Sequence, residues 1–143
     1  MHSVRRILED KPESEVVCVS EQTPVLEVVR LMAEHGIGSV LVMRSDQLAG
    51  IATERDYARK VILKGRSSQD TPVADIMSSP VLTVSPGDDI RRCMQIVTER
   101  RIRHLPVVEQ GQVVGLISIG DLLKWVIREQ EQEIEQLQQY IAG

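Results

Sequence analysis

The hydrophobic and polar positions of this chain follow a pattern that occurs twice. In the first copy, an apolar run is followed by apolar residues at helical spacing, which start after Thr23-Pro24. A hydroxyl residue followed by proline is typical of a helix start, and Gly36 and Gly38 end this helix. Two apolar runs around a polar turn then predict a hairpin, and a closing helix follows. The predicted elements are a strand at 16–19, a helix from 25, strands at 40–43 and 48–52, and a helix at 56–63.

The same order returns 65 residues later, without a gap. Ten identities link the copies between Val19 and Ile62, among them Val42 with Val107, and most other pairs keep their apolar or polar character. Asp88 takes the predicted helix-capping position of Thr23. The predicted elements of the second copy are a strand at 81–84, a helix over 90–97, strands at 105–108 and 113–117, and a helix from 121.

Neither copy is large enough to be stable alone, because small units bury too little surface. We therefore expect an α/β (α+β) fold in which two β-α-β-β-α repeats pack about a pseudo-twofold axis and share one core. The strands at 40–43 and 105–108 would lie at that seam. The expected boundaries are an N-terminal helix and linker at 1–15, repeats at 16–65 and 81–128, a linker at 66–80 and a C-terminal extension at 129–143.

The last helix is expected to run to about residue 140, beyond the repeat. Its second half is mostly Glu and Gln, with Ile127, Ile134, Leu137 and Ile141 as a thin apolar stripe. Two interpretations stay open for this stripe: a short coiled-coil seam, or packing within the protein's own dimer.

Composition limits the function classes. The chain has 143 residues, no Phe, one Trp and a formal charge of -4, so its core must be aliphatic and a general nucleic-acid-binding role is disfavoured. Cys18 and Cys93 have no metal-ligand spacing, and we expect both thiols to be buried. Without a signal segment or a membrane-spanning run, the expected location is the cytoplasm, with no membrane partner.

Each copy ends in the same chemical motif, Gly50-Ile51-Ala52-Thr53-Glu54-Arg55-Asp56 and Gly115-Leu116-Ile117-Ser118-Ile119-Gly120-Asp121. A carboxylate at a helix start can accept hydrogen bonds from both hydroxyls of a ribose, and the helix N-terminus favours a phosphate. The same spacing also resembles a capping box, in which the hydroxyl and the carboxylate only begin the helix. The two roles are compatible.

The paired motifs, together with the segment His104-Leu105-Pro106-Val107, resemble the cystathionine-β-synthase (CBS) domain. The resemblance covers roughly 16–128, and the segments 32–38 and 53–60 are similar to stand-alone bacterial proteins made of one CBS pair. It implies two clefts that bind adenine nucleotides and a dimer of two pairs. AMP is the first candidate, with ADP, ATP and NAD as others, and no metal is required.

The resemblance also implies roles for single residues. The motif aspartates would hold ribose, the motif hydroxyls would contact ribose or phosphate, and the backbone of the other repeat's first strand would meet adenine. One cleft would use Asp121 and Ser118 with Val17, Cys18 and Val19, and the other would use Asp56 and Thr53 with Val81, Leu82 and Thr83.

The two copies differ where phosphates would lie. Arg103 and His104, with Arg101 as a weaker candidate, precede a strand of the second copy, whereas the first copy has glycines there. This asymmetry assigns Arg103 and His104 to the Asp121 cleft. The Asp56 cleft would take its positive charge from Arg55, Arg59 or Lys60, hold a different ligand or stay empty.

No catalytic constellation is recognisable, so we expect a non-enzymatic nucleotide sensor that regulates an unidentified protein. The alternative is an adaptor dimer with vestigial clefts that acts through its C-terminal helix. An enzyme using bound nucleotide is a third possibility, for which the sequence offers no positioned acid, base or nucleophile.

Overall fold

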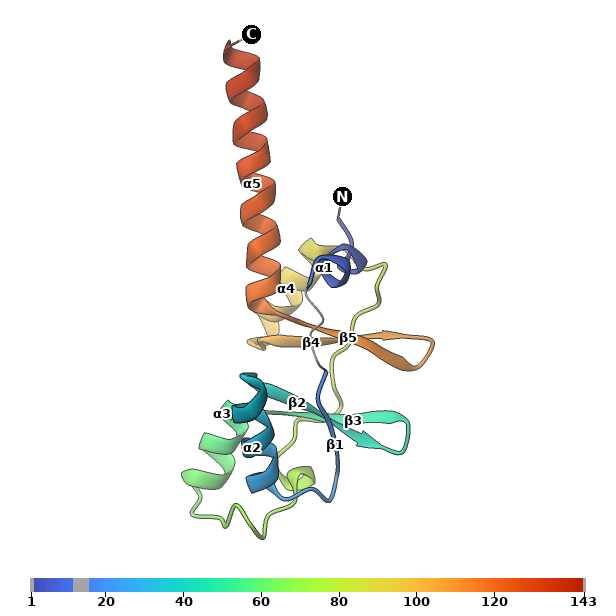
Figure 1. The fold of residues 1–143 in the computed structure, drawn as a ribbon, viewed down its shortest axis with the longest axis vertical. Helices are drawn as coiled ribbons and strands as arrows, with labels where there is room; N and C mark the ends of the chain where they lie inside the picture. Colours follow the sequence, from blue (N-terminus) through green and yellow to red (C-terminus); the bar gives the residue numbers. More distant parts are fainter. Residues whose placement is uncertain (1, 12–15, 143) are drawn as a thin grey trace.

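The computed structural model describes residues 2–11 and 16–142. Two small α/β halves are stacked on each other, and one long helix projects away from them (Figure 1). The predicted fold class is confirmed. Residues 12–15 of the predicted N-terminal linker lie outside the described residues.

The first half contains a three-stranded sheet in the order β1-β2-β3, with β1 parallel and β3 antiparallel to β2. The closing helix begins two residues earlier than predicted, and its second part is a π-helical turn. Its elements are β1 (Cys18–Ser20), α2 (Val25–His35), β2 (Ser39–Arg44), β3 (Gln47–Thr53), α3 (Glu54–Tyr57) and the π-helix η1 (Ala58–Ile62).

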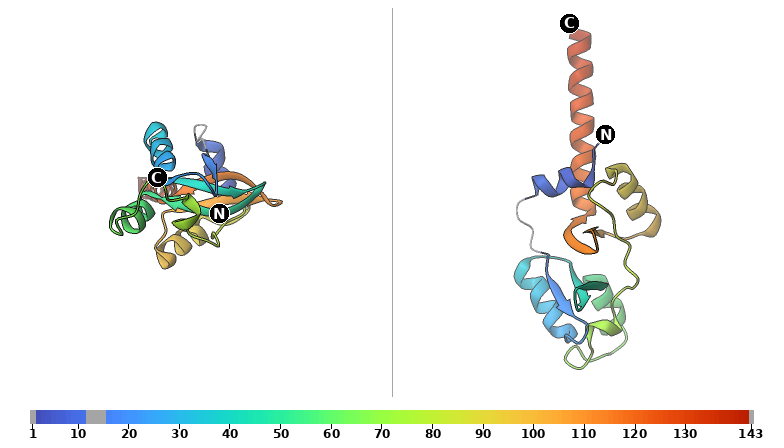
Figure 2. Two further views of the ribbon diagram at one scale, coloured as in Figure 1. Left: turned by 90° about the horizontal axis from the view of Figure 1, so that it is seen from below. Right: turned by 90° about the vertical axis from the view of Figure 1, so that its right-hand side faces the viewer.

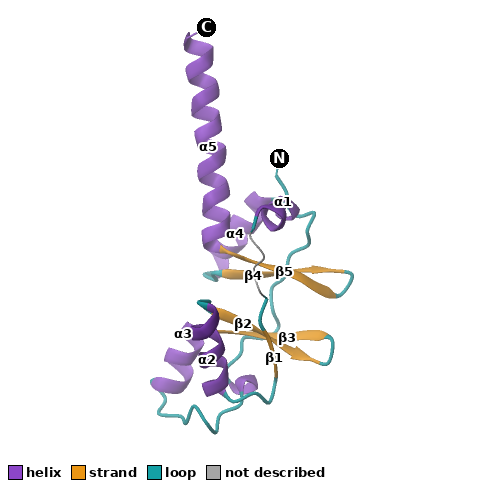
Figure 3. Cartoon of the chain, viewed as in Figure 1, coloured by secondary structure: helices purple, strands orange, loops and turns teal. Residues whose placement is uncertain are grey.

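The second half repeats this arrangement with α4 (Ile90–Arg100), β4 (His104–Glu109), β5 (Gln112–Ser118) and α5 (Ile119–Ala142). Its hairpin has a bulge after Val107, where the first hairpin has one after Val42. The two hairpins lie one above the other and point the same way (Figure 3). The strand predicted at 81–84 is wrong as a strand, because pairing there is limited to one parallel bridge between Val84 and Val107.

Both predicted helix caps are one residue early. The N-cap residues are Pro24 and Asp89, and the Asp89 carboxylate accepts a hydrogen bond from the Arg91 N–H at 2.9 Å. The residues predicted as caps stabilise the preceding turn instead. The Thr23 hydroxyl bonds Ser20, and the Asp88 carboxylate accepts from the Ser85 N–H.

The prediction of one shared core is also wrong, because the described residues form two buried clusters, one in each half. Val40 and Val42 point into the first cluster, and Leu105 and Val107 point into the second. Leu41 faces the opposite side of its strand and is also fully buried. β2 is therefore covered on both faces.

The segments that precede the two repeats are exchanged between the halves. α1 (Val4–Asp10) precedes the first repeat, yet Val4 and Ile7 belong to the core of the second half. The 3₁₀-helix η2 (Val73–Asp75) precedes the second repeat, yet Val73 belongs to the core of the first. Each segment is therefore a structural part of the repeat that it does not precede.

The two exchanged segments make equivalent contacts. The Val4 N–H donates to the Asp88 carbonyl at 2.9 Å, and the Val73 N–H donates to the Thr23 carbonyl at 2.8 Å. Each segment also ends against the motif glycine of its host strand: Leu8 contacts Gly115, and Met77 contacts Gly50. A side chain at either glycine would collide with these residues, which explains why glycine stands there.

α5 has 24 residues and confirms the predicted long helix. In Figure 1 and in the right-hand view of Figure 2 its second half extends beyond the rest of the molecule. Every residue from 130 to 142 is exposed. No helix of the described part of the chain is long and apolar enough to cross a membrane.

Candidate functional site

Asp56 lies at the junction of β3 and α3, where the predicted capping box is present. The Asp56 N–H donates to the Thr53 hydroxyl, and the carboxylate accepts from the Thr53 N–H at 3.0 Å. Lys60, one turn later, places its ammonium 3.1 Å from Oδ1 of Asp56. The helix start therefore fixes the carboxylate in position, and a carboxylate has lone pairs left for a ligand.

Asp121 has the equivalent geometry with a different cation. Its carboxylate accepts from the Ser118 N–H at 2.8 Å, and the Asp121 N–H donates to the Ser118 hydroxyl. Lys11, which follows α1, donates to Oδ2 of Asp121 at 2.9 Å and to the Leu116 carbonyl at 2.8 Å. Burial raises the pKa of Asp121, but the bonds from Ser118 and Lys11 outweigh it and hold the pKa below its ordinary value.

A pocket of about 420 Å³ lies beside Asp56, between the two halves. One part of its wall is apolar and the rest carries charged side chains from both repeats. The lining residues are Gly38, Ile51, Thr53, Glu54, Arg55, Asp56, Ser78, Pro80, Val81, Leu82, Arg101, Ile102, Arg103 and His104.

The basic residues of the second repeat lie in this Asp56 pocket, which corrects their assignment to the Asp121 cleft. Arg101, Arg103 and His104 all line it. The turn from α4 into β4 faces the first repeat: a Cβ on Gly38 would lie 3.9 Å from Cε1 of His104. Their position in the sequence predicts that these side chains lie beside the motif of their own repeat. Because the two halves are stacked, they lie beside the motif of the first repeat instead.

His104 is half-buried in this wall. Burial and the neighbouring Arg103 charge lower its pKa below the ordinary value, and Lys11 adds to this effect. Asp121 and Glu54 act in the opposite direction with smaller effect. The imidazole is therefore mostly neutral near pH 7 in the absence of a ligand.

Of the two segments predicted to contact adenine, 17–19 and 81–83, only part lines the Asp56 pocket. Val81 and Leu82 line the Asp56 pocket, whereas Thr83 is exposed and is not among its lining residues. On β1 the side chain of Val19 packs in the core of the first half, and the Val17 carbonyl accepts from the Leu41 N–H. Cys18 is exposed, so the expectation that both thiols are buried holds for Cys93 alone.

Two cations near the motif aspartates were not singled out as their partners from the sequence. The sequence predicts Lys60 only as a general source of positive charge and Lys11 only as part of the linker that precedes the first repeat. For Lys60 the spacing of four from Asp56 on a helix was an available signal. For Lys11 the signal was an internal similarity at an offset of 69, where Val4, Ile7 and Leu8 match Val73, Ile76 and Met77.

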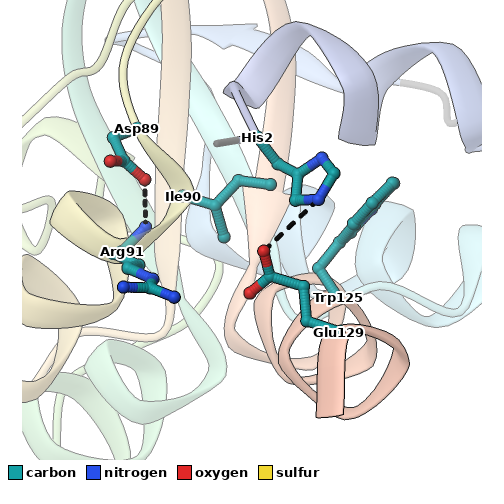
Figure 4. Close-up of a pocket in the computed structure, with 6 residues that line it drawn as sticks. All are labelled: His2, Asp89, Ile90, Arg91, Trp125 and Glu129. Atoms are coloured by element: carbon teal, nitrogen blue, oxygen red, sulfur yellow. Dashed lines mark hydrogen bonds and ion pairs between the residues drawn. The ribbon is translucent and has the colours of Figure 1, made fainter. Parts of the chain in front are cut away.

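A second hollow, of about 280 Å³, lies where the N-terminus, α4 and α5 meet (Figure 4). The imidazole of His2 lies 3.3 Å from the Glu129 carboxylate and packs against the Trp125 ring. Asp89, Ile90 and Arg91 form the opposite wall. None of the predicted site residues lies in this hollow, and the part of the chain that the structure describes holds no cluster suited to a metal ion.

Comparison with known proteins agrees with the fold and with the paired motifs. The family model of the CBS domain matches residues 4–63 and 73–128, so both repeats are covered. The chain belongs to the CBS domain family, as a tandem pair.

The chain is 41% identical over 131 residues to the mitochondrial CBS domain-containing protein CBSX3 of Arabidopsis thaliana. This match covers 88% of the chain and 63% of that relative, so the chain spans less than two thirds of its length. The CBS domain-containing protein YhcV of Bacillus subtilis is 32% identical, with 80% of the chain and 81% of the relative covered.

Solved structures give the same result. A protein with CBS domains from Burkholderia ambifaria is 48% identical, with a TM-score of 0.86 over 90% of this chain and 96% of that one. A CBS domain protein from Pyrobaculum aerophilum, solved in complex with AMP, is 25% identical, with a TM-score of 0.72 over 84% and 89% of the two chains.

Proposed function

We propose that this CBS pair is a regulatory module that binds an adenine nucleotide in the Asp56 pocket. One observation carries the proposal: a single pocket combines the Asp56 carboxylate, an apolar wall and three basic side chains of the second repeat, Arg101, Arg103 and His104. A nucleoside phosphate needs these three kinds of contact, for ribose, base and phosphate.

The nucleotide would span the pocket from the apolar wall to the basic residues. Ile51, Val81 and Leu82 offer a surface for the base, and Asp56 accepts from the ribose hydroxyls. Arg103 and His104 then meet the phosphates. AMP is the first candidate, because a structural relative binds it; ADP, ATP and NAD are the other candidates.

The Asp121 cleft would bind more weakly, because Arg101, Arg103 and His104 line the Asp56 pocket. In addition, the lysine that competes with ribose is more buried at Asp121, where Lys11 is 20% exposed, than at Asp56, where Lys60 is 43% exposed. The protein would thus have one strong and one weak nucleotide site. The signal would pass, without catalysis, to a protein partner through a dimer of this chain. The cytoplasmic location stays a prediction.

The decisive experiment combines extraction and calorimetry. Acid extraction of the purified protein identifies any nucleotide that it already carries. Isothermal titration of the extracted and refolded protein with AMP, ADP, ATP and NAD then gives the affinities. Asp56→Asn should weaken the strongest ligand about 10- to 100-fold, since a charge-assisted hydrogen bond contributes about 1.5–3 kcal/mol.

Arg103→Ala should weaken the binding of the same ligand. Arg100→Ala, at the exposed last residue of α4, is the matched control. Asp121→Asn should leave the strong site intact. Binding that survives Asp56→Asn but is lost in Asp121→Asn would reverse the site assignment. No binding of any nucleotide, together with an empty extract, would refute the sensor function.

A further inference from the structure

The apolar stripe of α5 points away from the protein's own body. Leu122 is fully buried against the second half, and Trp125 and Glu129 face His2 (Figure 4). Leu123 and Ile127 lie on the other side of the same turns and are 44% and 53% exposed. The body therefore occupies one face of α5 and leaves the stripe on the opposite face uncovered.

The stripe follows a heptad pattern with one polar position, Gln130. Ile127, Ile134 and Ile141 occupy every seventh position, the a positions, and Leu123 and Leu137 occupy d positions with Gln130 between them. In this register Leu122 and Glu129 are c positions and Trp125 is an f position, on the outer surface of a coiled coil. Isoleucine at a and leucine at d favour two parallel strands.

The second half of α5 is poorly suited to exist as a single helix. Every residue from 130 to 142 is exposed, and a solvated helix of this length is marginal in water. Its carboxylates also repel along the helix, since Glu129 and Glu133, and Glu131 and Glu135, stand four residues apart. Covering the apolar stripe would supply the missing stabilisation.

The charged and polar residues beside the apolar stripe favour a second copy of this chain, with its α5 parallel to the first, as the partner that covers the stripe. In a parallel pair, Glu133 at g meets Gln138 of the other helix at e, and Val126 at g meets Glu131, so no like charges face each other. An antiparallel pair centred on the same residues would oppose Glu131 to Glu131 and Glu133 to Glu133.

Gln130 gives an independent reason for the parallel arrangement. In a parallel, in-register pair it faces Gln130 of the other helix, and the two amides can hydrogen-bond to each other. In the antiparallel pair it would face Ile134 and bury an unpartnered amide. We propose that α5 forms a parallel, in-register two-stranded coiled coil with a second copy of this chain through Leu123, Ile127, Gln130, Ile134, Leu137 and Ile141.

Disulfide trapping on the full chain tests this pairing. In a Cys18→Ser background, which removes the exposed thiol, Ile134→Cys and Leu137→Cys should each form a cross-linked dimer in a glutathione buffer. The matched control is Gln132→Cys, an f position, which should stay monomeric on a non-reducing gel. Because the proposal does not depend on nucleotide binding, the same assay is run with the nucleotide-free protein.

A second variant separates the coiled coil from any other dimer contact. Adding Ile127→Asp to the Ile134→Cys protein should abolish the cross-link while circular dichroism still shows the folded body, whereas Gln132→Asp should leave it unchanged. Cross-linking of Gln132→Cys as efficient as that of Ile134→Cys would overturn the proposal. So would a cross-link that forms only when Ile134→Cys and Gln130→Cys are combined, because that pattern belongs to antiparallel helices.

Discussion

Lys11 and Asp121 form an ion pair 2.9 Å long between the segment after α1 and the motif of the second repeat. Both side chains are only 20% exposed. The equivalent Asp56 pairs with Lys60 of its own helical segment instead. The two copies of the motif therefore differ in where the cation comes from.

Replacement of Lys11 by Met should lower the free energy of unfolding at pH 7 by about 1–2 kcal/mol, since the Asp121 carboxylate loses a charge-assisted hydrogen bond. The pKa of Asp121 lies below its ordinary value, so its stabilising effect is present at neutral pH and is lost as the pH falls through that pKa. Urea unfolding should therefore show a difference from the unmodified protein that shrinks below about pH 4. Lys64→Met, at an exposed lysine, should show no such difference at any pH.

The motif glycines should respond unequally to a methyl group. Gly50→Ala would press on Sδ, Cγ and Cβ of Met77, so the whole side chain must move. Gly115→Ala would meet mainly Cδ2 of Leu8, at 2.6 Å, the far end of a side chain that can rotate. We expect Gly50→Ala to destabilise by about 1–3 kcal/mol and Gly115→Ala by less, as thermal unfolding can measure. Gly87→Ala, where a Cβ meets nothing within 4 Å, is the control.

Nucleotide affinity should rise as the pH falls from 7 toward 5.5. Burial and Arg103 keep the pKa of His104 low in the free protein, and a bound phosphate would favour the charged imidazole, so binding takes up a proton. Calorimetry in two buffers with different ionisation enthalpies measures this uptake. His104→Gln should remove the part of the pH dependence due to the imidazole and leave the part due to the nucleotide's own phosphate. Equal proton uptake by both proteins would exclude His104 from the phosphate site.

The two cysteines should react with thiol reagents at very different rates. Cys18 is exposed, whereas Cys93 is fully buried, and burial with the charges of Asp88 and Asp89 raises its pKa to about 11. Because the thiolate is the reactive form, one thiol should react quickly with Ellman's reagent and the second only on unfolding. Cys18→Ser should eliminate the fast phase, and a fast phase that persists would contradict this assignment.

The sequence predicted those features that lie within one repeat. The hairpins, the long last helix and the capping geometry at Asp56 and Asp121 depend on local spacing, and the structure contains all of them. The strand at 81–84 failed because sheet formation depends on neighbours that a sequence pattern does not specify.

Features that join the repeats could not be predicted from the 65-residue offset. The packing of Leu8 on Gly115, the pairing of Lys11 with Asp121 and the position of Arg103 in the Asp56 pocket all depend on which half faces which. The segments that precede the repeats match at an offset of 69 rather than 65 residues, so an alignment of the repeats without gaps does not detect their similarity. The physical cause is the same in each case: contacts between distant segments depend on how the halves stack.

The exchange of the leading segments means that the chain cannot be cut into two working halves. A fragment ending near residue 70 would lack Val73 and Ile76, and the remaining fragment would lack Val4 and Ile7, so each would expose part of its core. A lone ancestral repeat would have had to donate its leading segment to a second molecule, as a domain-swapped dimer does. Fusion of two such copies into one chain would have made this mutual dependence permanent. The two copies of the motif could then diverge in sequence while the exchanged segments kept both halves in one fold.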